Sequence, residues 1–384
     1  GPGGGGNGSA RYPSTVSATP GGTNTGGGGG GGGRYPGTPK AGGTGADGVL
    51  ITKEIDKASG VWNINDHFSN IKCSTWVTRK ATTDYMVVAG GGGSASAGGG
   101  GGGAGGYRAS GYGPSPLRGT ALSLRMGSYT VTIGAGGAGG PFPGTNIGAN
   151  GTNSVFSSIT SAGGGRGSQS FPSTNPNFPA GKNIGSAGGS GGGGGYSCHG
   201  NPSPSSVSNP LTQGGAGDTP DVDPNQGFPG GAGQTGWYGN DGSGGGATAA
   251  GGDASGPSTE AGGAGGNGGA GAPNTILGPD TTYAGGGGGP AYSGATAGTG
   301  GAGGGGAGQN STAAGVAGGD NTGGGAGGSK SAVGAIGGPG VVVVRTPSDF
   351  TLAVTPCTNA VAACVGPTND KTAKFTVNGT LTIS

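Results

Sequence analysis

Charged residues are scarce in this sequence, and their scarcity limits the partners that the protein can have. Only 8% of the 384 residues are Asp, Glu, Lys or Arg, and the formal net charge is +2. Nucleic-acid binding needs clustered Lys and Arg to neutralise phosphates, whereas the 17 basic residues here are scattered. We therefore expect no nucleic-acid partner. The low charge also disfavours the kind of disorder that comes from high net charge.

Long apolar runs are missing as well. The longest, Val341 to Val344 with its flanks, is far shorter than the ~20 residues that span a bilayer, so we expect no membrane insertion. Leu, Ile, Val and Phe make up about an eighth of the residues, below the roughly 20% under which globular folding becomes doubtful. Side-chain burial alone therefore cannot order this chain.

Cysteine and histidine are too rare to suggest catalysis. Four cysteines do not make a disulfide scaffold in a chain this long. Cys357 and Cys364 are close in sequence and could be bonded if their Cα atoms approach within about 4.4 to 6.8 Å. Cys198 and His199 lack both the third group that orients a catalytic pair and a second pair of zinc ligands. We expect a protein that is not an enzyme and has no cofactor.

Glycine, in contrast, supplies 112 residues, many of them in runs. A glycine at every third position, as collagen requires, is missing. The remaining ordered structure is polyglycine II, an extended helix without internal hydrogen bonds whose amides bond to neighbouring segments. One run alone would stay disordered, because ordering each residue costs about 1 to 2 kcal/mol. Flexible linkers are the alternative to a packed bundle. The runs include Gly98–Gly103, Gly163–Gly165, Gly191–Gly195, Gly285–Gly289 and Gly303–Gly306.

Several short segments have the composition of β-strands. Tyr85 to Ala89 is a candidate buried strand. Strands are also expected at 121–125 and 129–133, joined as a hairpin through 126–128, and at 154–160. The predicted fold is mainly β with irregular structure and little α-helix, in which a small antiparallel β base carries a bundle of polyglycine II helices.

An internal repeat indicates how the chain is divided. Gly48-Val-Leu-Ile-Thr-Lys53 returns as Gly340-Val-Val-Val-Val-Arg345, and each is predicted to be the closing strand of a module after a glycine-rich stretch. Because the first residue is glycine and no apolar secretory segment follows, we expect a fragment of a longer protein. The expected parts are the end of a preceding glycine-rich module (1–53), a connector with a short helix carrying Phe68, Ile71 and Trp76 (54–84), a glycine-rich module (85–346) and the start of a β domain (347–384).

Aromatic residues between the glycine runs are the best candidates for binding. Loops on a rigid scaffold commonly carry recognition, and Tyr and Trp offer a large rigid surface at low entropic cost. An equally plain interpretation is that several rings cover the ends of the bundle. The candidates for contact with a receptor are Tyr107, Tyr112, Phe171, Phe178, Tyr196, Phe228, Trp237 and Tyr238, with Tyr292 among the other aromatics so placed.

One acidic loop has features of a calcium site. Asp221, Asp223 and Asn225, with Asp218 before them, place oxygen ligands at alternate positions. The bidentate Glu expected at the twelfth position is absent, and the turn glycine is displaced by one. A solvated Asp-Pro turn is the alternative.

The order of these pieces resembles the glycine-rich module of bacteriophage tail fibres and tail-tip adhesins, over about residues 60 to 346. The resemblance implies a virion fibre, a sandwich of polyglycine II helices, and loops that recognise receptors on the host surface. The segments that carry it are Gly60–Ile64, Tyr85–Gly91, Ser128–Gly137, Asn153–Thr160 with Ala162–Gly165, and Gly340–Arg345.

The expected function is therefore a structural and receptor-binding module of a virion tail fibre, which binds a bacterial surface glycan or an outer-membrane protein. The alternative is an extracellular filament or fibre shaft that assembles from copies of itself or other fibre subunits and has passive loops. Ice or mineral binding on a flat polyglycine face is a third hypothesis, supported by composition alone.

Overall fold

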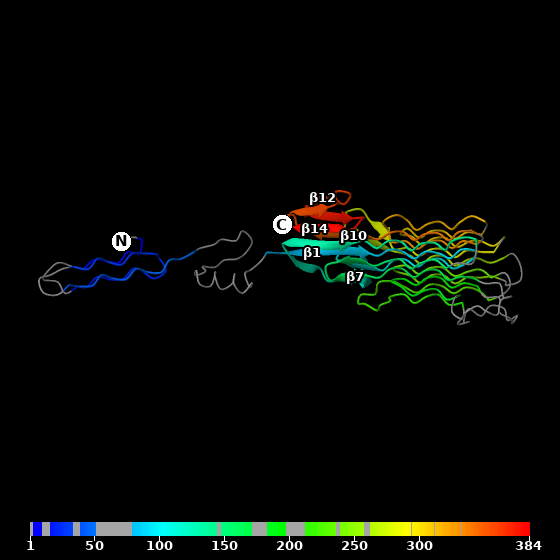
Figure 1. Ribbon diagram of the computed structural model, residues 1–384, viewed down its shortest axis with the longest axis horizontal. Coiled ribbons are helices and arrows are strands. Elements are labelled where there is room, and N and C mark those ends of the chain that lie inside the picture. Colours follow the sequence, from blue (N-terminus) through cyan, green and yellow to red (C-terminus); the bar gives the residue numbers. More distant parts are fainter. Residues whose placement is uncertain are drawn as a thin grey trace. The chain divides into compact units, whose positions relative to one another are not determined.

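The computed structural model divides the chain into two compact units, Gly1–Thr78 and Arg79–Ser384 (Figure 1). The predicted helix of the connector lies outside the described residues. The structure describes residues 3–9, 16–33, 39–50, 79–143, 147–170, 183–196, 212–235, 239–256, 262–292, 294–310, 312–330 and 332–384.

The described part of the first unit consists of extended glycine-rich segments bonded through their backbones. Gly30 is typical: its N–H donates to the carbonyl of Thr19 (3.0 Å) and its carbonyl accepts from the N–H of Gly43 (2.8 Å). The bonds recur every third residue, since Gly27 and Gly33 on the same segment accept from later residues in the same way. The described part of this unit is ordered by backbone hydrogen bonds rather than by a side-chain core.

The second unit contains two mainly antiparallel sheets that pack face to face as its β base. One has seven strands in the order β12-β13-β10-β1-β2-β3, with β4 also paired to β1 and a parallel pairing of β2 with β3. Its strands are β1 (Lys80–Val88), β2 (Tyr107–Ser110), β3 (Arg118–Gly119), β4 (Leu122–Arg125), β10 (Val341–Thr346), β12 (Ala360–Val365) and β13 (Asp370–Phe375).

The other sheet has five strands in the order β11-β14-β5-β6-β7. A separate hairpin pairs β8 with β9, and the one helical turn among the described residues is a 3-10 turn, η1 (Ser115–Leu117). The unit is thus mainly β, as predicted. The bounds of these strands are β5 (Gly127–Thr132), β6 (Ser154–Phe156), β7 (Ile159–Ser161), β8 (Ala272–Asn274), β9 (Thr281–Tyr283), β11 (Leu352–Thr355) and β14 (Gly379–Ile383).

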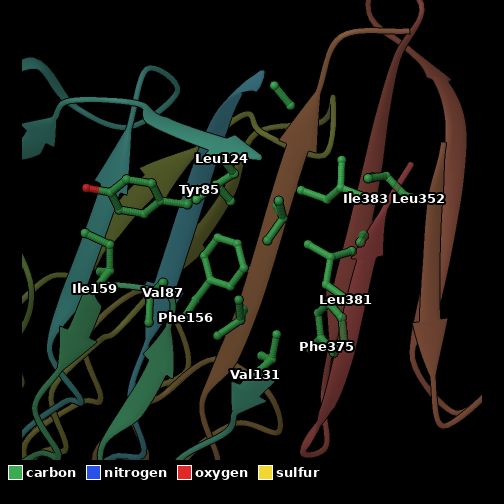
Figure 2. Packing of buried hydrophobic residues seen from close by; sticks show 14 of the residues in the cluster. Tyr85, Val87, Leu124, Val131, Phe156, Ile159, Leu352, Phe375, Leu381 and Ile383 are labelled. Atoms are coloured by element: carbon green, nitrogen blue, oxygen red, sulfur yellow. The ribbon is translucent and has the colours of Figure 1, made fainter. Parts of the chain in front are cut away.

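The core of the base lies on both faces of β1 and β10. Alternate side chains of a strand point to opposite faces, so Tyr85 and Val87 of β1 enter the cluster between the two sheets, where Phe156 is fully buried (Figure 2). Met86 and Val88 enter a second cluster on the other face of the larger sheet. The unbroken apolar runs of these two strands therefore reflect burial on both sides.

The predicted hairpin at 126–128 is wrong. Leu122–Arg125 pairs with β1 in the larger sheet, whereas Gly127–Thr132 pairs with β14 and β6 in the smaller one. The chain crosses between sheets at Met126 and Gly127, whose φ is +147°. The single strand predicted at 154–160 is itself a hairpin of β6 and β7, turning at Ser157 with φ +52°.

Residues 347–384 complete the base rather than starting a separate domain, which corrects that predicted boundary. β13 pairs with β10, and β14 pairs with β5. Phe375 and Leu381 are fully buried in the cluster between the sheets. Similarly, β1 begins at Lys80 inside the range predicted as connector. Local sequence could not show this, because the partners of these strands lie far away in the chain.

The rest of the unit is a bundle of extended glycine-rich segments that run from the β base to the far end and back (Figure 1). Segment 89–97 bonds to six others. Its N–H groups donate in turn to segments 103–106, 149–152 and 332–338, and its carbonyls accept from 137–140, 164–167 and Ala326. The neighbours that bond to it more than once are met at every third residue, as in the donor bonds of Gly91, Ser94 and Ala97 to Gly338, Ala335 and Ala332.

At many positions where segments meet, only glycine fits. A Cβ on Gly92 would lie 2.2 Å from the carbonyl oxygen of Gly165, and one on Gly102 would lie 2.1 Å from that of Gly92. Real Cβ atoms do not approach backbone this closely. The spacing between segments is therefore set by the absence of side chains.

Exposed residues other than glycine are found on the outer rows of the bundle. In segment 134–141, Gly134, Gly137 and Gly140 are buried, whereas Ala135, Ala138 and Pro141 are exposed. At this border, side chains replace the missing neighbour: Asn150 Oδ1 accepts from Arg166 N–H and Asn153 Oδ1 from Gly163 N–H, both at 2.9 Å.

Candidate functional site

Three of the predicted receptor contacts lie where the bundle meets the β base. Tyr107 in β2 is 1% exposed, and its hydroxyl oxygen accepts a hydrogen bond from Asn274 Nδ2 at 2.6 Å. Burial raises the pKa of Tyr107 to about 12. Tyr107 is therefore a packing residue. Phe228 is partly exposed, and its backbone is bonded to Gly246 and Gly191.

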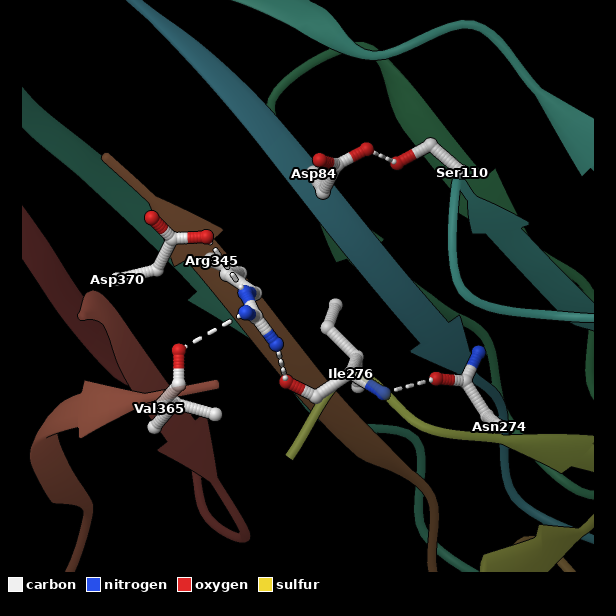
Figure 3. Close-up of polar contacts among 7 residues, drawn as sticks. All are labelled: Asp84, Ser110, Asn274, Ile276, Arg345, Val365 and Asp370. Carbon is white, nitrogen blue, oxygen red and sulfur yellow. Dashed lines mark hydrogen bonds and ion pairs between the residues drawn. The ribbon is translucent and has the colours of Figure 1, made fainter. Parts of the chain in front are cut away.

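Tyr112 belongs to a structural cluster around Arg345. The guanidinium lies 4.4 Å from the centre of the Tyr112 ring. Arg345 also donates to Asp370 Oδ2 at 3.0 Å and to the carbonyls of Ile276 and Val365 at 3.1 and 2.9 Å (Figure 3). Arg345 is only 5% exposed, so these bonds offset the cost of burying its charge.

The other contacts drawn beside Arg345 are also internal. Asp84 Oδ1 accepts from the Ser110 hydroxyl at 2.6 Å, and Asn274 Oδ1 accepts from the Ile276 N–H at 2.8 Å. The cluster joins β10, the β12–β13 hairpin and the residues after β8. Because its polar groups are already bonded within the chain, we assign it a structural role.

The predicted calcium loop is closed by its own hydrogen bonds. The Asp218 carboxyl accepts from Gln226 N–H at 3.2 Å, and Asn225 Oδ1 accepts from Gly227 N–H at 2.7 Å. Burial raises the pKa of Asp218. Asp221 and Asp223 are exposed. In the described part of the chain, no group of three or more His, Cys, Asp or Glu side chains is placed to hold a metal ion.

Other predicted site residues lie wholly or partly outside what the structure describes. Cys357 is free and exposed, and the side chain of Cys364, its predicted partner, lies outside what the structure describes. Also outside the described residues are Phe171, Phe178, Trp237, Tyr238, Cys198 and His199.

No helix among the described residues is both long and apolar enough to cross a membrane.

The far end of the bundle holds a polar cluster centred on Asp241. This carboxyl group is fully buried, and its Oδ1 accepts hydrogen bonds from the Ser170 hydroxyl and from the Tyr196 N–H, the latter at 2.7 Å. Burial raises the pKa of Asp241, and the nearby charge of Lys330 opposes that rise. Its second oxygen has no hydrogen-bond partner among the described residues.

Lys330 lies between two tyrosine rings at this end. Its Nζ is 4.5 Å from the centre of the Tyr196 ring and 5.5 Å from that of Tyr292, distances at which a cation is attracted to a ring face. Its Nζ also donates to the carbonyl of Gly239 at 3.4 Å. Lys330 and both tyrosines are partly exposed. We call Tyr196, Asp241, Tyr292 and Lys330 the distal cluster.

The backbone around the distal cluster is held by glycine and asparagine. A Cβ on Gly239 would lie 2.5 Å from the Cβ of Tyr196, so glycine is needed beneath that side chain. Asn240 Oδ1 accepts from the Tyr292 N–H at 2.8 Å, while its Nδ2 donates to the Ser255 carbonyl at 3.1 Å. The two rings and the cation are therefore presented from a fixed framework.

Sequence reasoning selected Tyr196 and noted Tyr292 but missed Asp241 and Lys330. Each is a single charged residue at the edge of a glycine run, with nothing nearby in sequence to pair them. The scarcity of charged residues could have pointed to them, because an isolated charge inside a glycine-rich stretch of a nearly neutral chain needs a partner.

Comparison with known proteins identifies a family. No curated protein and no solved structure matches the chain. One sequence family does match, over residues 68–347. That range contains β1 to β10, the whole glycine bundle and the distal cluster. The chain therefore belongs to the glycine-rich domain family.

Proposed function

We propose that the second unit is a non-enzymatic module of a bacteriophage-type tail fibre, in which a polyglycine II bundle presents its far end to a receptor on a bacterial surface. The polyglycine II assignment is supported by the three-residue spacing of the hydrogen bonds and by neighbours on all sides of segment 89–97. In such a structure the backbone supplies the rigidity that a large apolar core supplies elsewhere.

The observation that carries the proposal is the distal cluster. Lys330 lies between two partly exposed tyrosines and near the buried carboxyl group of Asp241, at the end of the bundle away from β1, where Gly98 bonds to Ser329. Aromatic rings and a cation can contact sugar rings and acidic groups, which are abundant on bacterial surfaces. The site is proposed as extracellular, on the virion, with a surface glycan or outer-membrane protein as its partner.

The test is binding of the labelled chain to a panel of Gram-negative cells. We expect Tyr292→Ala and Lys330→Gln each to weaken cell binding about tenfold or more, the scale of an interface hot spot. Lys80→Gln is the matched control, since it removes the same charge from an exposed residue of the base. Equal binding by all the variants would refute a receptor contact at this end.

A fibre shaft or extracellular filament with passive loops is the second candidate, favoured by the backbone-bonded glycine segments that both units contain. It predicts no cell binding and end-to-end polymers of the purified chain in negative-stain images. Cell binding without polymers would exclude it.

A further inference from the structure

One side of the glycine bundle exposes an unusual number of large apolar residues. On adjacent outer segments, Val316 and Val333 are each 47% exposed and Ile336 is 58% exposed. Phe142, at the end of the outer segment 134–142, is 51% exposed, and Ile147 is 39% exposed. Isolated exposed apolar residues are common, but a contiguous group marks an interaction surface.

These residues lie on segments that are bonded to one another. Gly318 N–H donates to the Ile336 carbonyl at 2.9 Å, and Gly337 N–H donates to the Gly137 carbonyl, also at 2.9 Å. Segments 313–319, 332–340 and 134–142 are therefore consecutive on the surface, and none of them contains a charged residue. We call this surface the apolar face.

Closing the border of the bundle does not require apolar side chains. Elsewhere the same outer positions carry polar residues, such as exposed Thr296, Thr299 and Asn267. A non-glycine residue of any kind would block the approach of another segment. The choice of Val, Ile, Pro and Ala on the apolar face therefore has a separate reason.

The side chains of the apolar face repeat at a fixed distance. Exposed residues recur every third position, as Val333 and Ile336 do on one segment and Ala135 and Ala138 do on the next. Three residues of this extended helix span about 9.3 Å. The two segments are antiparallel, since Gly334 bonds to Gly140 and Gly340 to Gly134. The result is a surface of rows and furrows with one repeat length.

We propose that the apolar face is the contact surface for a second copy of this chain. The rows of side chains on one such surface fit into the furrows of another surface that has the same repeat. An identical bundle has that repeat. Since the face has no charge, two copies do not repel each other. A two-fold axis would place Val333 and Ile336 of each copy against the other's face, as in an isologous dimer.

The face is three segments wide, so the association is of the weak class that buries less than about 1,200 Å² in total. The experiment is sedimentation velocity of the intact chain from about 5 µM to about 500 µM, spanning the range of such weak contacts. We expect reversible dimers whose dissociation constant rises at least tenfold in Val333→Asp/Ile336→Asp, where like charges would oppose each other.

The matched control is Gln213→Asp/Ala216→Asp, which adds the same charges at the same three-residue spacing to exposed positions of another outer segment. It should dimerise like the original chain. Ile336→Asn is a milder second variant and should weaken the dimer without adding charge. Thermal melts of the variants check that each is folded.

The proposal is overturned if the chain is monomeric at the highest concentration or if the Val333/Ile336 variant dimerises unchanged. Thermal hysteresis in ice, given by the monomer and lost in that variant, would also overturn it by assigning the face to ice. Cell binding by the distal cluster is measured separately, so failure of either proposal leaves the other standing.

Discussion

The β base and the glycine bundle of the second unit are ordered by opposite means. The base buries Tyr85, Phe156 and Phe375 between two sheets, and its stability follows from apolar area removed from water. The bundle buries carbonyl and amide groups against each other, and at glycines such as Gly92 and Gly102 it leaves no room for a Cβ. In the base, removing a methyl group from the core lowers stability, whereas in the bundle adding a methyl group lowers it.

The largest effect is expected from adding one methyl group to the bundle. A Cβ at Gly102 would meet the Gly92 carbonyl oxygen at 2.1 Å, with backbone rather than a flexible side chain in the way. Gly102→Ala should therefore cost more than about 4 kcal/mol, a loss seen only with severe steric or packing faults. Chemical denaturation would measure it.

Ala104→Gly in the same segment is its counterpart. It removes a methyl group and should cost about 0.5 to 1 kcal/mol through glycine's backbone entropy. Similar losses for the two variants would mean that the segment is not close-packed.

In the base, stability should fall when side-chain atoms are removed rather than added. Phe156 is fully buried and packs edge-on against Tyr129, with ring centroids 6.4 Å apart. Phe156→Ala should cost about 3 to 5 kcal/mol, read from urea denaturation. Val377→Ala, at a position that is 41% exposed, should change stability by less than about 0.5 kcal/mol.

A smaller, pH-dependent effect is expected at Asp241. Its pKa is raised by burial, so the folded state holds this proton more tightly than the unfolded state does. The stability that this group contributes is present below its unfolded pKa of about 3.9 and is lost as pH rises through the folded pKa. The difference in stability between the original chain and Asp241→Asn should therefore fall as pH rises from about 4. A difference that grows over this range would show that Lys330 outweighs burial.

The smallest loss of stability is expected at the border of the bundle rather than in its interior. Asn153 Oδ1 accepts from Gly163 N–H at 2.9 Å in place of a neighbouring segment. Asn153→Ala should cost about 1 kcal/mol, the net value of one hydrogen bond, and should speed hydrogen exchange at Gly163. Asn153→Asp keeps the acceptor and should restore protection. Unchanged exchange in the alanine variant would contradict the proposed role of this side chain.

The sequence predicted the elements whose signal is local. Tyr85 to Ala89 and Val341 to Val344 are apolar and β-branched over several residues, and each forms a buried strand. The crossing at Met126 was missed because a turn between two strands has the same composition whether the strands pair with each other or join different sheets. The Lys330–Tyr196 contact was beyond prediction, since glycine runs give no register by which distant segments could be aligned.

The three-residue spacing along each segment also bears on how such a bundle can change in evolution. In segment 134–141 one row of positions is buried glycine, while another carries the outward residues Ala135, Ala138 and Pro141. Substituting glycine at that row would turn border into interior and admit a further segment beside it. Widening the bundle thus needs changes at every third codon of one stretch and an insertion elsewhere, with no redesign of the β base.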